Sequence, residues 1–396
     1  DKTCWFESSL GHIKFINYII ILTKLNFSMK ILLVEPYYTG SHKQWAEGLQ
    51  KFSKNEIRII SMKGQFWKWR MHGGAVTLAR QFEELKWKPD FIFASDMLDL
   101  STFLSLKRES SYNIPTAIYF HENQLSYPWS PKDRDIEKNR DSHYGFINYA
   151  SSLVADKVLF NSKYQMDSYF EALKKLLNNF PDNRETATIK DIKIKSKVLN
   201  LGLDLKRYDK YFTENINAPI ILWNHRWEYD KDPETFFQTL EKLKNNGFDF
   251  RLAVLGENFS KSPQIFNKAK ILFKNNIVHW GYSNSLKDYA TWLWKSDIIP
   301  VTSKQEFFGA SVMEAVYCNT YPILPNRLSY PELLPQRFHK DHIYQNTEDL
   351  YQKLAWAIKN ITTVRNSDIR KIATKYDWSN IISKYESIFS DVLNNN

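Results

Sequence analysis

Short apolar runs alternate with longer helical patterns along most of the chain, and this alternation limits the fold more than any other feature. In the first half, runs such as Lys30–Glu35, Pro115–Phe120 and Lys157–Asn161 read as buried strands. A fresh alternation starts at Pro219–Trp223 and continues through Asp297–Val301. Strands that alternate with helices form parallel, doubly wound sheets. The sequence therefore predicts an α/β protein with two consecutive Rossmann-like halves.

Length and composition favour a folded, multi-domain protein with a basic surface. The chain has 396 residues, of which 43% are hydrophobic, enough for a sizeable core. A formal net charge of +10 would attract nucleic acid, nucleotide sugars or anionic membrane, although a general lysine-rich bias explains it equally well. Cys4 and Cys318 match no metal spacing and imply no disulfide framework, which favours a reducing, cytoplasmic location.

The domain boundaries are predicted from shifts in this pattern. Residues 1–28 precede the first strand at Met29 and read as an N-terminal extension or leader. The apolar run within it, Phe15–Leu25, is interrupted by polar residues and is too short to span a membrane, and no later segment reaches that length. We expect one domain over 29–207, a second over 208–375, and a C-terminal helix over 376–396 that returns to the first domain.

The stretch Ser303–Tyr317 is the strongest candidate for a ligand site in the second half. It follows an apolar strand and runs into a helical pattern, with Glu306 in the turn and Glu314 within the helix. Gly309 and Ala310 are small enough for a ligand to approach the backbone, and free N–H groups at a helix start suit a phosphate. Two carboxylates can accept hydrogen bonds from the hydroxyls of a sugar and a ribose.

Two cations lie in the loop after the strand Pro219–Trp223. Arg226 and Lys231 flank this loop at the carboxyl end of the strand, where open α/β sheets bind ligands. A guanidinium and an ammonium at this position suit a diphosphate.

The first half offers candidates at the corresponding strand ends. Gly40 and Ser41 follow the first strand and can place backbone N–H groups near a phosphate, although an ordinary strand–helix turn explains them as well. His121 ends a predicted strand and is the best catalytic candidate of this half, with a capping role as its alternative. Asp96 and Asp99 follow the strand Pro89–Ser95.

Aromatic and basic residues are interleaved in Gly64–Gly74, which we predict to be a loop. Flat rings beside cations are the chemistry that binds unpaired nucleotides, whereas a hydrophobic loop packed on its own domain is the alternative. The residues concerned are Trp67, Lys68, Trp69, Arg70 and His72. Asp133 and Asp135 form an Asp-x-Asp motif that can hold a metal, but the charged loop around them favours a solvated surface.

The second-half residues together resemble the retaining GT-B glycosyltransferases of family 4. That resemblance implies a fold of two Rossmann-like domains that face each other across a cleft. It implies that Arg226 and Lys231 neutralise the donor diphosphate, that Glu306 and the backbone at Phe308 and Gly309 face the donor sugar, and that Glu314 binds the ribose. It also implies that Gly40, Ser41 and His121 contact the donor from the first domain. By this resemblance, no metal or other cofactor is required.

A narrower resemblance rests on the first half and points to the tRNA-queuosine mannosyltransferase family. The segments that are similar are Glu35–Gln44, Trp69–Gly73, Ser95–Asp99, Tyr119–Pro128 and His143–Tyr149. The resemblance implies retaining transfer of mannose from GDP-mannose to queuosine at the wobble position of aspartate tRNA. The partners would then be this tRNA and a nucleotide sugar, with no membrane and a monomeric enzyme.

The predicted site and its alternatives follow from both halves. The predicted catalytic residues are His121, Arg226, Lys231 and Glu306; the predicted donor contacts are Gly40, Ser41, Arg226, Lys231, Phe308, Gly309, Ala310 and Glu314; and the predicted tRNA contacts are Trp67, Lys68, Trp69, Arg70, His72, Asp96, Glu122 and Asn123. One alternative is a family 4 enzyme that acts on a cell-envelope glycan or glycolipid. Another is a non-catalytic tRNA-binding protein, which the intact cation and carboxylate set argues against.

Overall fold

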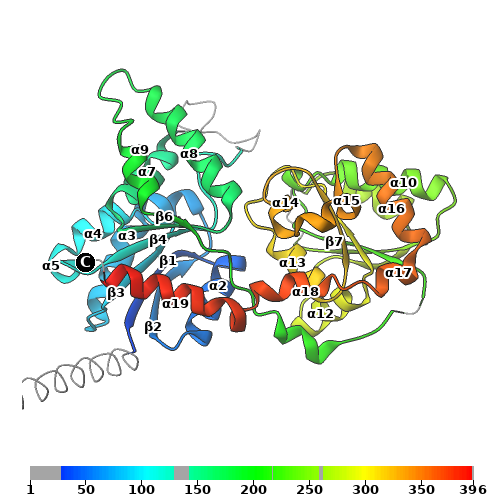
Figure 1. The fold of residues 1–396 in the computed structure, drawn as a ribbon, viewed down its shortest axis with the longest axis horizontal. Coiled ribbons are helices and arrows are strands. Elements are labelled where there is room, and N and C mark those ends of the chain that lie inside the picture. Colours follow the sequence, from blue (N-terminus) through cyan, green and yellow to red (C-terminus); the bar gives the residue numbers. More distant parts are fainter. Residues whose placement is uncertain (1–27, 129–141, 216, 258–261, 395–396) are drawn as a thin grey trace, which may run out of the picture.

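The chain forms two domains, each built on a six-stranded parallel sheet covered by helices (Figure 1). A computed structural model describes residues 28–128, 142–215, 217–257 and 262–394. The predicted extension over 1–28 and the Asp133/Asp135 motif lie outside these residues, apart from Ser28. In the described part of the chain, no helix is long and apolar enough to cross a membrane.

The first sheet has the strand order β2-β1-β3-β4-β5-β6. Its central strands are completely buried because helices cover both faces, which is why they read as continuous apolar runs. The strands are β1 (Lys30–Tyr38), β2 (Glu56–Lys63), β3 (Phe91–Ser95), β4 (Thr116–Phe120), β5 (Lys157–Phe160) and β6 (Ser196–Val198). The helices are α2 (Gly40–Phe52), α3 (Trp67–Glu84), α4 (Leu100–Leu106), α5 (Arg108–Ser111), α7 (Ser142–Val154), α8 (Lys163–Asn178) and α9 (Thr188–Ile194).

The second sheet has the strand order β12-β11-β10-β7-β8-β9. Its strands are β7 (Ile220–Asn224), β8 (Arg251–Leu255), β9 (Ile277–Trp280), β10 (Ile298–Pro300), β11 (Tyr321–Pro325) and β12 (Ile343–Tyr344). Its helices are α10 (Pro233–Asn245), α11 (Ile265–Leu272), α12 (Leu286–Lys295), α13 (Ala310–Tyr317), α14 (Tyr330–Leu333), α15 (His339–His342), α16 (Thr347–Lys359) and α17 (Ile361–Arg365). The 3-10 helix η1 (Lys206–Tyr211) lies between the two sheets in sequence.

Local signals in the sequence set several helix starts. Ser162 caps α8 by accepting a hydrogen bond from the backbone N–H of Gln165, as its position before the helix predicts. Ser285 caps α12 in the same way. Pro233 occupies the first turn of α10, where its missing N–H costs no hydrogen bond.

The last helices, α18 (Arg370–Ala373) and α19 (Trp378–Asn394), return the chain to the first domain (Figure 1). The Trp378 ring is fully buried and fits between two glycines, since a Cβ on Gly48 or Gly202 would lie only 2.0 or 2.6 Å from it. The Trp45 indole N–H of α2 donates to the Tyr385 hydroxyl of α19 at 3.1 Å. The C-terminal helix thus packs on the first sheet's α2.

The predicted loop Gly64–Gly74 is wrong, because α3 already begins at Trp67. The prediction rested on the mixture of aromatic and basic residues between the two glycine positions. In the structure Gly73 and Gly74 lie inside α3, where a Cβ on Gly73 would lie 2.9 Å from the Trp69 ring and one on Gly74 would make an ordinary 3.4 Å contact with Pro36. The helix thus continues through both glycines, although each costs about 1 kcal/mol in a helix interior.

Candidate functional site

The candidate site lies where the strand order of each sheet reverses. The first sheet reverses between β1 and β3, and the second between β7 and β10. Ligands of open α/β sheets bind beyond the carboxyl ends of such strands. The predicted residues Gly40 and Asp96 follow β1 and β3, while Arg226 follows β7. Both domains thus carry predicted site residues at the switch points of their sheets.

Lys231 forms the centre of the charged cluster in the second domain. Its buried ammonium donates to the Gln305 carbonyl at 2.8 Å and lies 3.2 Å from an Asp230 carboxylate oxygen and 3.5 Å from Glu306. Burial lowers the pKa of Lys231, but the carboxylates of Glu306 and Asp230 outweigh it and raise the pKa overall. The site therefore holds a permanent positive charge at neutral pH.

Glu306 is held as a carboxylate beside this ammonium. One of its oxygens accepts the backbone N–H groups of Phe307 at 3.1 Å and Phe308 at 3.3 Å. Burial raises the pKa of Glu306, yet the Lys231 charge and the Phe308 N–H outweigh burial and leave the pKa below its usual value. Glu306 is therefore an ionised, oriented acceptor for a hydroxyl group.

The turn after Glu306 opens the helix α13. Gly309 has a φ of +100°, in the left-handed region, and a Cβ there would lie 3.1 Å from Leu333. Glycine is thus required both by the backbone and by the space available. Ala310 begins α13, so the first N–H groups of that helix have no carbonyl partner within it and can face a ligand. Phe308 is buried, and its ring meets Tyr376 edge-on at 5.1 Å.

Glu314 is oriented by three donors. Tyr208 donates its hydroxyl to one carboxylate oxygen at 2.8 Å, Arg207 donates to the same oxygen at 3.3 Å, and Tyr289 donates to the other at 2.7 Å. A carboxylate has about four acceptor positions, so one stays available for a ligand hydroxyl. Arg207 was missed in the sequence because it lies at the end of the first predicted domain, where the pattern gives only a strand end and a linker.

Arg226 faces the first domain. It is half-exposed, and its guanidinium lies 3.2 Å from Glu228. Burial and the carboxylates of Glu122 and Asp230 raise the pKa of Tyr127, and Arg226 opposes them. Because Glu122 and Tyr127 belong to the first domain while Asp230 and Arg226 belong to the second, the two halves of the site face one another.

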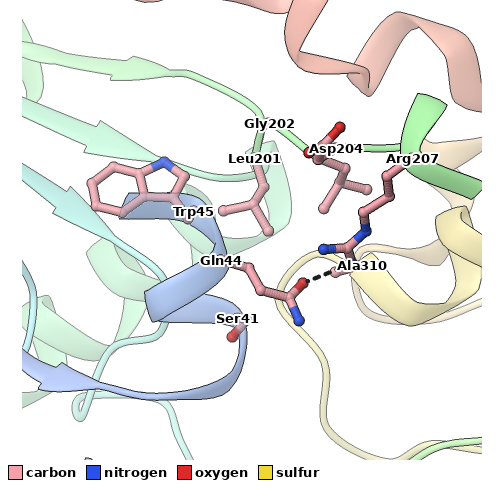
Figure 2. A pocket seen from close by; sticks show the side chains of 9 residues that line it. Ser41, Gln44, Trp45, Leu201, Gly202, Asp204, Arg207 and Ala310 are labelled. Carbon is pink, nitrogen blue, oxygen red and sulfur yellow. Dashed lines mark hydrogen bonds between the residues drawn. The ribbon is translucent and has the colours of Figure 1, made fainter. Parts of the chain in front are cut away.

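A small pocket lies between the domains beside these groups (Figure 2). Ser41 and Gln44 of α2 line one wall, and Arg207 and Ala310 line another. Arg207 donates to the Gln44 side-chain oxygen at 3.3 Å, the bond drawn in Figure 2. Gly40, with a φ of +51°, has open space where a Cβ would point. The predicted donor contacts Ser41 and Ala310 thus share one pocket.

His121 is buried at the end of β4 and is held by its backbone. Its N–H donates to Asp96 at 2.8 Å, and its carbonyl accepts from the Asn161 amide at 2.8 Å. Burial lowers the pKa of His121 well below its usual value, and the nearby charge of His42 adds to this effect. Within the described residues, His121 Nε2 and Asp96 Oδ2 have no hydrogen-bond partner, which is unusual for buried atoms and typical of a site that binds a ligand or water.

A buried ion pair of Glu35 and His42, next to His121, was not predicted from the sequence. His42 Nδ1 lies 3.1 Å from Glu35 Oε2, and the His42 ring packs against the His121 ring at a tilt of 34°, with 4.1 Å between centroids. Burial lowers the pKa of His42, but the charge and hydrogen bond of Glu35 outweigh it and raise the pKa to about 9. Both residues lie in the segment Glu35–Gln44, which resembled a known family, so the motif itself held the signal.

The same three residues are the group most suited to hold a metal among the described residues. The ligand atoms of Glu35, His42 and His121 all lie within 4.8 Å of one another. However, Glu35 already shares a proton with the His42 ring, and a histidine that holds its proton is a poor metal ligand. We therefore interpret the group as an ion pair that supports His121.

The remaining candidate residues that follow β3 and β4 lie in different environments. Glu122 accepts a hydrogen bond from Gln124 at 3.1 Å, and burial raises its pKa while His42 and Arg226 oppose the rise. Asn123 is buried and shapes its own loop by accepting the Ser126 N–H at 2.9 Å. Asp99 caps α4 by accepting the Thr102 N–H, so it has a structural role.

The predicted aromatic and basic residues of α3 do not form one surface. Trp67 packs beside Tyr144 with 5.0 Å between centroids, and His72 stacks on His143 at 4.6 Å. Lys68 lies over the Trp67 ring at 5.6 Å. Arg70 donates to the Lys63 carbonyl at 3.0 Å, and Trp69, whose side chain is 63% exposed, faces solvent.

Comparison with known proteins decides the family. Residues 30–203 match the family model described as the N-terminal part of tRNA-queuosine alpha-mannosyltransferase, and residues 206–375 match glycosyl transferases group 1. A Drosophila melanogaster protein named tRNA-queuosine alpha-mannosyltransferase is 33% identical over 337 residues, which span 82% of this chain and 85% of that protein. The chain belongs to the tRNA-queuosine alpha-mannosyltransferase family. It is a glycosyltransferase, and the resemblance seen in its sequence is confirmed.

Solved structures place this family member in the GT-B fold. A glycosyltransferase from Rickettsia africae is 18% identical, with a TM-score of 0.62 and coverage of 93% of this chain and 100% of that one. Sucrose-phosphate synthase from Thermosynechococcus elongatus is 13% identical, with a TM-score of 0.67 and coverage of 92% of this chain and 99% of that one. The predicted fold of two facing Rossmann-like domains is thus confirmed.

The two family matches cover different parts of the candidate site in this member of the tRNA-queuosine alpha-mannosyltransferase family. Arg226, Lys231, Glu306 and Glu314 lie within the general glycosyltransferase match. Asp96, His121 and the residues of α3 lie within the match that is specific to the queuosine family. The family-specific half therefore contains the residues predicted to meet the acceptor.

Proposed function

We propose that this enzyme transfers mannose from GDP-mannose to queuosine at the wobble position of aspartate tRNA, with retention of configuration. One observation carries the proposal: a cation and carboxylate cluster around Lys231 and Glu306 faces Glu122 and Tyr127 of a domain that matches the queuosine family. The relative from Drosophila is named for mannosyl transfer to queuosine in tRNA.

The second domain would bind the donor. Arg226 and Lys231 supply two positive charges for the diphosphate, and the first N–H groups of α13 add donors at Ala310. Glu306 would accept from a sugar hydroxyl, and Glu314 would accept from the ribose.

The chemistry would need charge stabilisation more than a covalent nucleophile. The bond between mannose and diphosphate would break with oxocarbenium character on the sugar, while negative charge grows on the leaving group. Arg226, Lys231 and the α13 N–H groups would stabilise that charge, at about 3–4 kcal/mol per well-placed donor. The acceptor hydroxyl would attack from the face that the diphosphate leaves, with a phosphate oxygen as base and neutral His121 beside the reacting carbon. We propose that no metal takes part.

The first domain would bind the tRNA. The net charge of +10 suits a polyanionic acceptor, and the described part of the chain has no helix suited to cross a membrane. Glu122 would contact the modified base, while the fully buried Asp96 and Asn123 would hold the loop around it by accepting the N–H groups of His121 and Ser126. Action on tRNA accords with the cytoplasmic location predicted from the sequence.

The deciding experiment is incubation of the enzyme with GDP-mannose and queuosine-containing aspartate tRNA, followed by nucleoside mass spectrometry. We expect a hexose added to queuosine, and no addition to the same tRNA that carries guanosine in place of queuosine. Hydrolysis of GDP-mannose without any tRNA product would support GDP-mannose as the donor. It would contradict queuosine as the acceptor and favour an envelope glycan instead.

The donor half can be tested by itself through thermal stability. GDP should raise the melting temperature of the wild type, because a ligand that binds only the folded state stabilises it. Glu314→Gln should weaken GDP binding about 10- to 150-fold, since a hydrogen bond to a charged acceptor contributes about 1.5–3 kcal/mol. The measured quantity is the shift caused by GDP, which is independent of any loss of stability in the variant itself.

Glu234→Gln, on the exposed surface of α10, is the matched control for this experiment. It should keep the full GDP shift. An equal shift in Glu314→Gln would contradict the ribose role of Glu314.

A further inference from the structure

Two large aromatic side chains at the start of α3 face solvent. The Phe66 side chain is 75% exposed and the Trp69 side chain is 63% exposed. Phe66 directly precedes the first turn of α3 and Trp69 lies within that turn, so both rings project from the start of the helix. Phe66 also has a φ of +55°, which is costly for a bulky residue. Exposed aromatic groups held in this way suggest a surface that meets a partner.

Gly73 allows the Trp69 ring to lie against the helix. A Cβ at this position would be 2.9 Å from the ring, closer than carbon atoms can approach without a shift. The helix thus has a glycine where any side chain would push the indole away, although glycine destabilises a helix interior. One face of the ring rests on the helix, and the exposed fraction of Trp69 leaves the other side to solvent. Such a flat, supported ring is suited to stacking.

The charged residues next to the two rings in the sequence are all positive. From Ser61 to Gly74 the chain has Lys63, Lys68 and Arg70 and no acidic residue. The first turn of α3 also lacks acidic residues, so its free N–H groups add to the positive potential. Aromatic rings beside cations bind the bases and phosphates of single-stranded nucleic acid, whereas a protein partner would need no such charge.

The rings lie beside the candidate site. Trp67, between Phe66 and Trp69 in sequence, packs on the cluster of Met71, Met97, Tyr144 and Ile147, and so does Tyr37. Tyr37 in turn lies near the catalytic candidates: burial and Glu122 raise its pKa, and Arg226 opposes them. A nucleotide stacked on Trp69 would therefore belong to the same bound molecule as a base in the cleft.

We propose that Phe66 and Trp69 form a stacking platform for an unpaired nucleotide that neighbours the modified base in the acceptor RNA. This inference rests on the proposed function, since it assigns the acceptor a single-stranded loop. Trp67 and His72 serve a different purpose, because they pack on residues at the start of α7. Gly73 is a positioning residue, which acts by setting the orientation of Trp69.

The test compares RNA binding by the wild type with that of Trp69→Ala and Gly73→Ala. The probe is a fluorescent RNA hairpin with the anticodon-loop sequence of aspartate tRNA, and a fully paired duplex of its stem is the reference. Loss of one base–aromatic stack should weaken hairpin binding about 10-fold in each variant and leave duplex binding unchanged. The tRNA KM should rise by the same factor, while kcat and the melting shift caused by GDP stay unchanged.

Gly73→Ala is the sharper variant, because it keeps every aromatic and charged group and improves helix propensity. Val76→Ala, at another exposed apolar position of α3, is the matched control and should bind RNA like the wild type. Unchanged hairpin binding in Trp69→Ala, an equal loss in Val76→Ala, or no hairpin binding by the wild type would overturn the platform. If the wild type adds no hexose but its hairpin binding depends on Trp69, the proposed function fails and the platform stands.

Discussion

Arg226→Ala should lower kcat/KM for GDP-mannose about 100- to 1,000-fold and leave the melting temperature near that of the wild type. The rate falls because the guanidinium no longer offsets the charge that grows on the leaving diphosphate. Stability is retained because Arg226 is half-exposed and its ion pair with Glu228 is near the surface, where such pairs contribute little. Initial rates of hexose transfer and calorimetry provide the two measurements.

Lys231→Ala should lose a similar factor in rate but should also lose stability. Its ammonium is buried beside Asp230 and Glu306, so removing it leaves the buried Asp230 carboxylate and the partly buried Glu306 carboxylate without their cation. The two variants thus separate electrostatic catalysis from structural support. Arg251→Ala removes a partly exposed cation of the same domain that pairs with the exposed Asp249, and it should keep the wild-type rate. Wild-type turnover in both Arg226→Ala and Lys231→Ala would refute the diphosphate assignment.

The fold was predictable because its signals are local. Buried parallel strands appear as apolar runs, and two runs of the second half precede residues of the candidate site: β7 leads to Arg226, and β10 leads to Glu306. Glu306, Gly309 and Glu314 lie within nine residues of one another, so the turn and helix that join them are readable from the chain alone. These residues do come together in the structure, around the start of α13.

The features that were missed depend on contacts between distant parts of the chain. Arg207 matters because it meets Gln44 and Glu314, which lie 163 and 107 positions away. The segment that starts α3 was predicted as a loop, yet the helix runs through Gly73 and Gly74. Propensity gives the cost of glycine in a helix, but it does not show that the ring of Trp69 lies against Gly73.

The His42–Glu35 pair should make the stability of the first domain depend on pH in the alkaline range. The pKa of His42 is raised from 6.5 to about 9 in the folded protein, so the folded state holds a proton that the unfolded state has lost over this window. Stability is then fully present below pH 6.5 and falls as the pH rises through 9, by about 3 kcal/mol in total. Chemical unfolding at a series of pH values measures this loss.

His42→Gln cannot take up the proton and should remove most of this pH dependence. Glu35→Gln should do the same, because the Glu35 carboxylate keeps the His42 ring protonated. Asp96 titrates with the same sign, since burial raises its pKa, so Asp96→Asn is needed to separate its share. His143→Gln, at an exposed position, should keep the wild-type slope. The pair matters for function because the His42 ring packs directly against His121. If His42→Gln kept the full alkaline loss of stability, the proposal that a charged His42–Glu35 pair supports His121 would have to be abandoned.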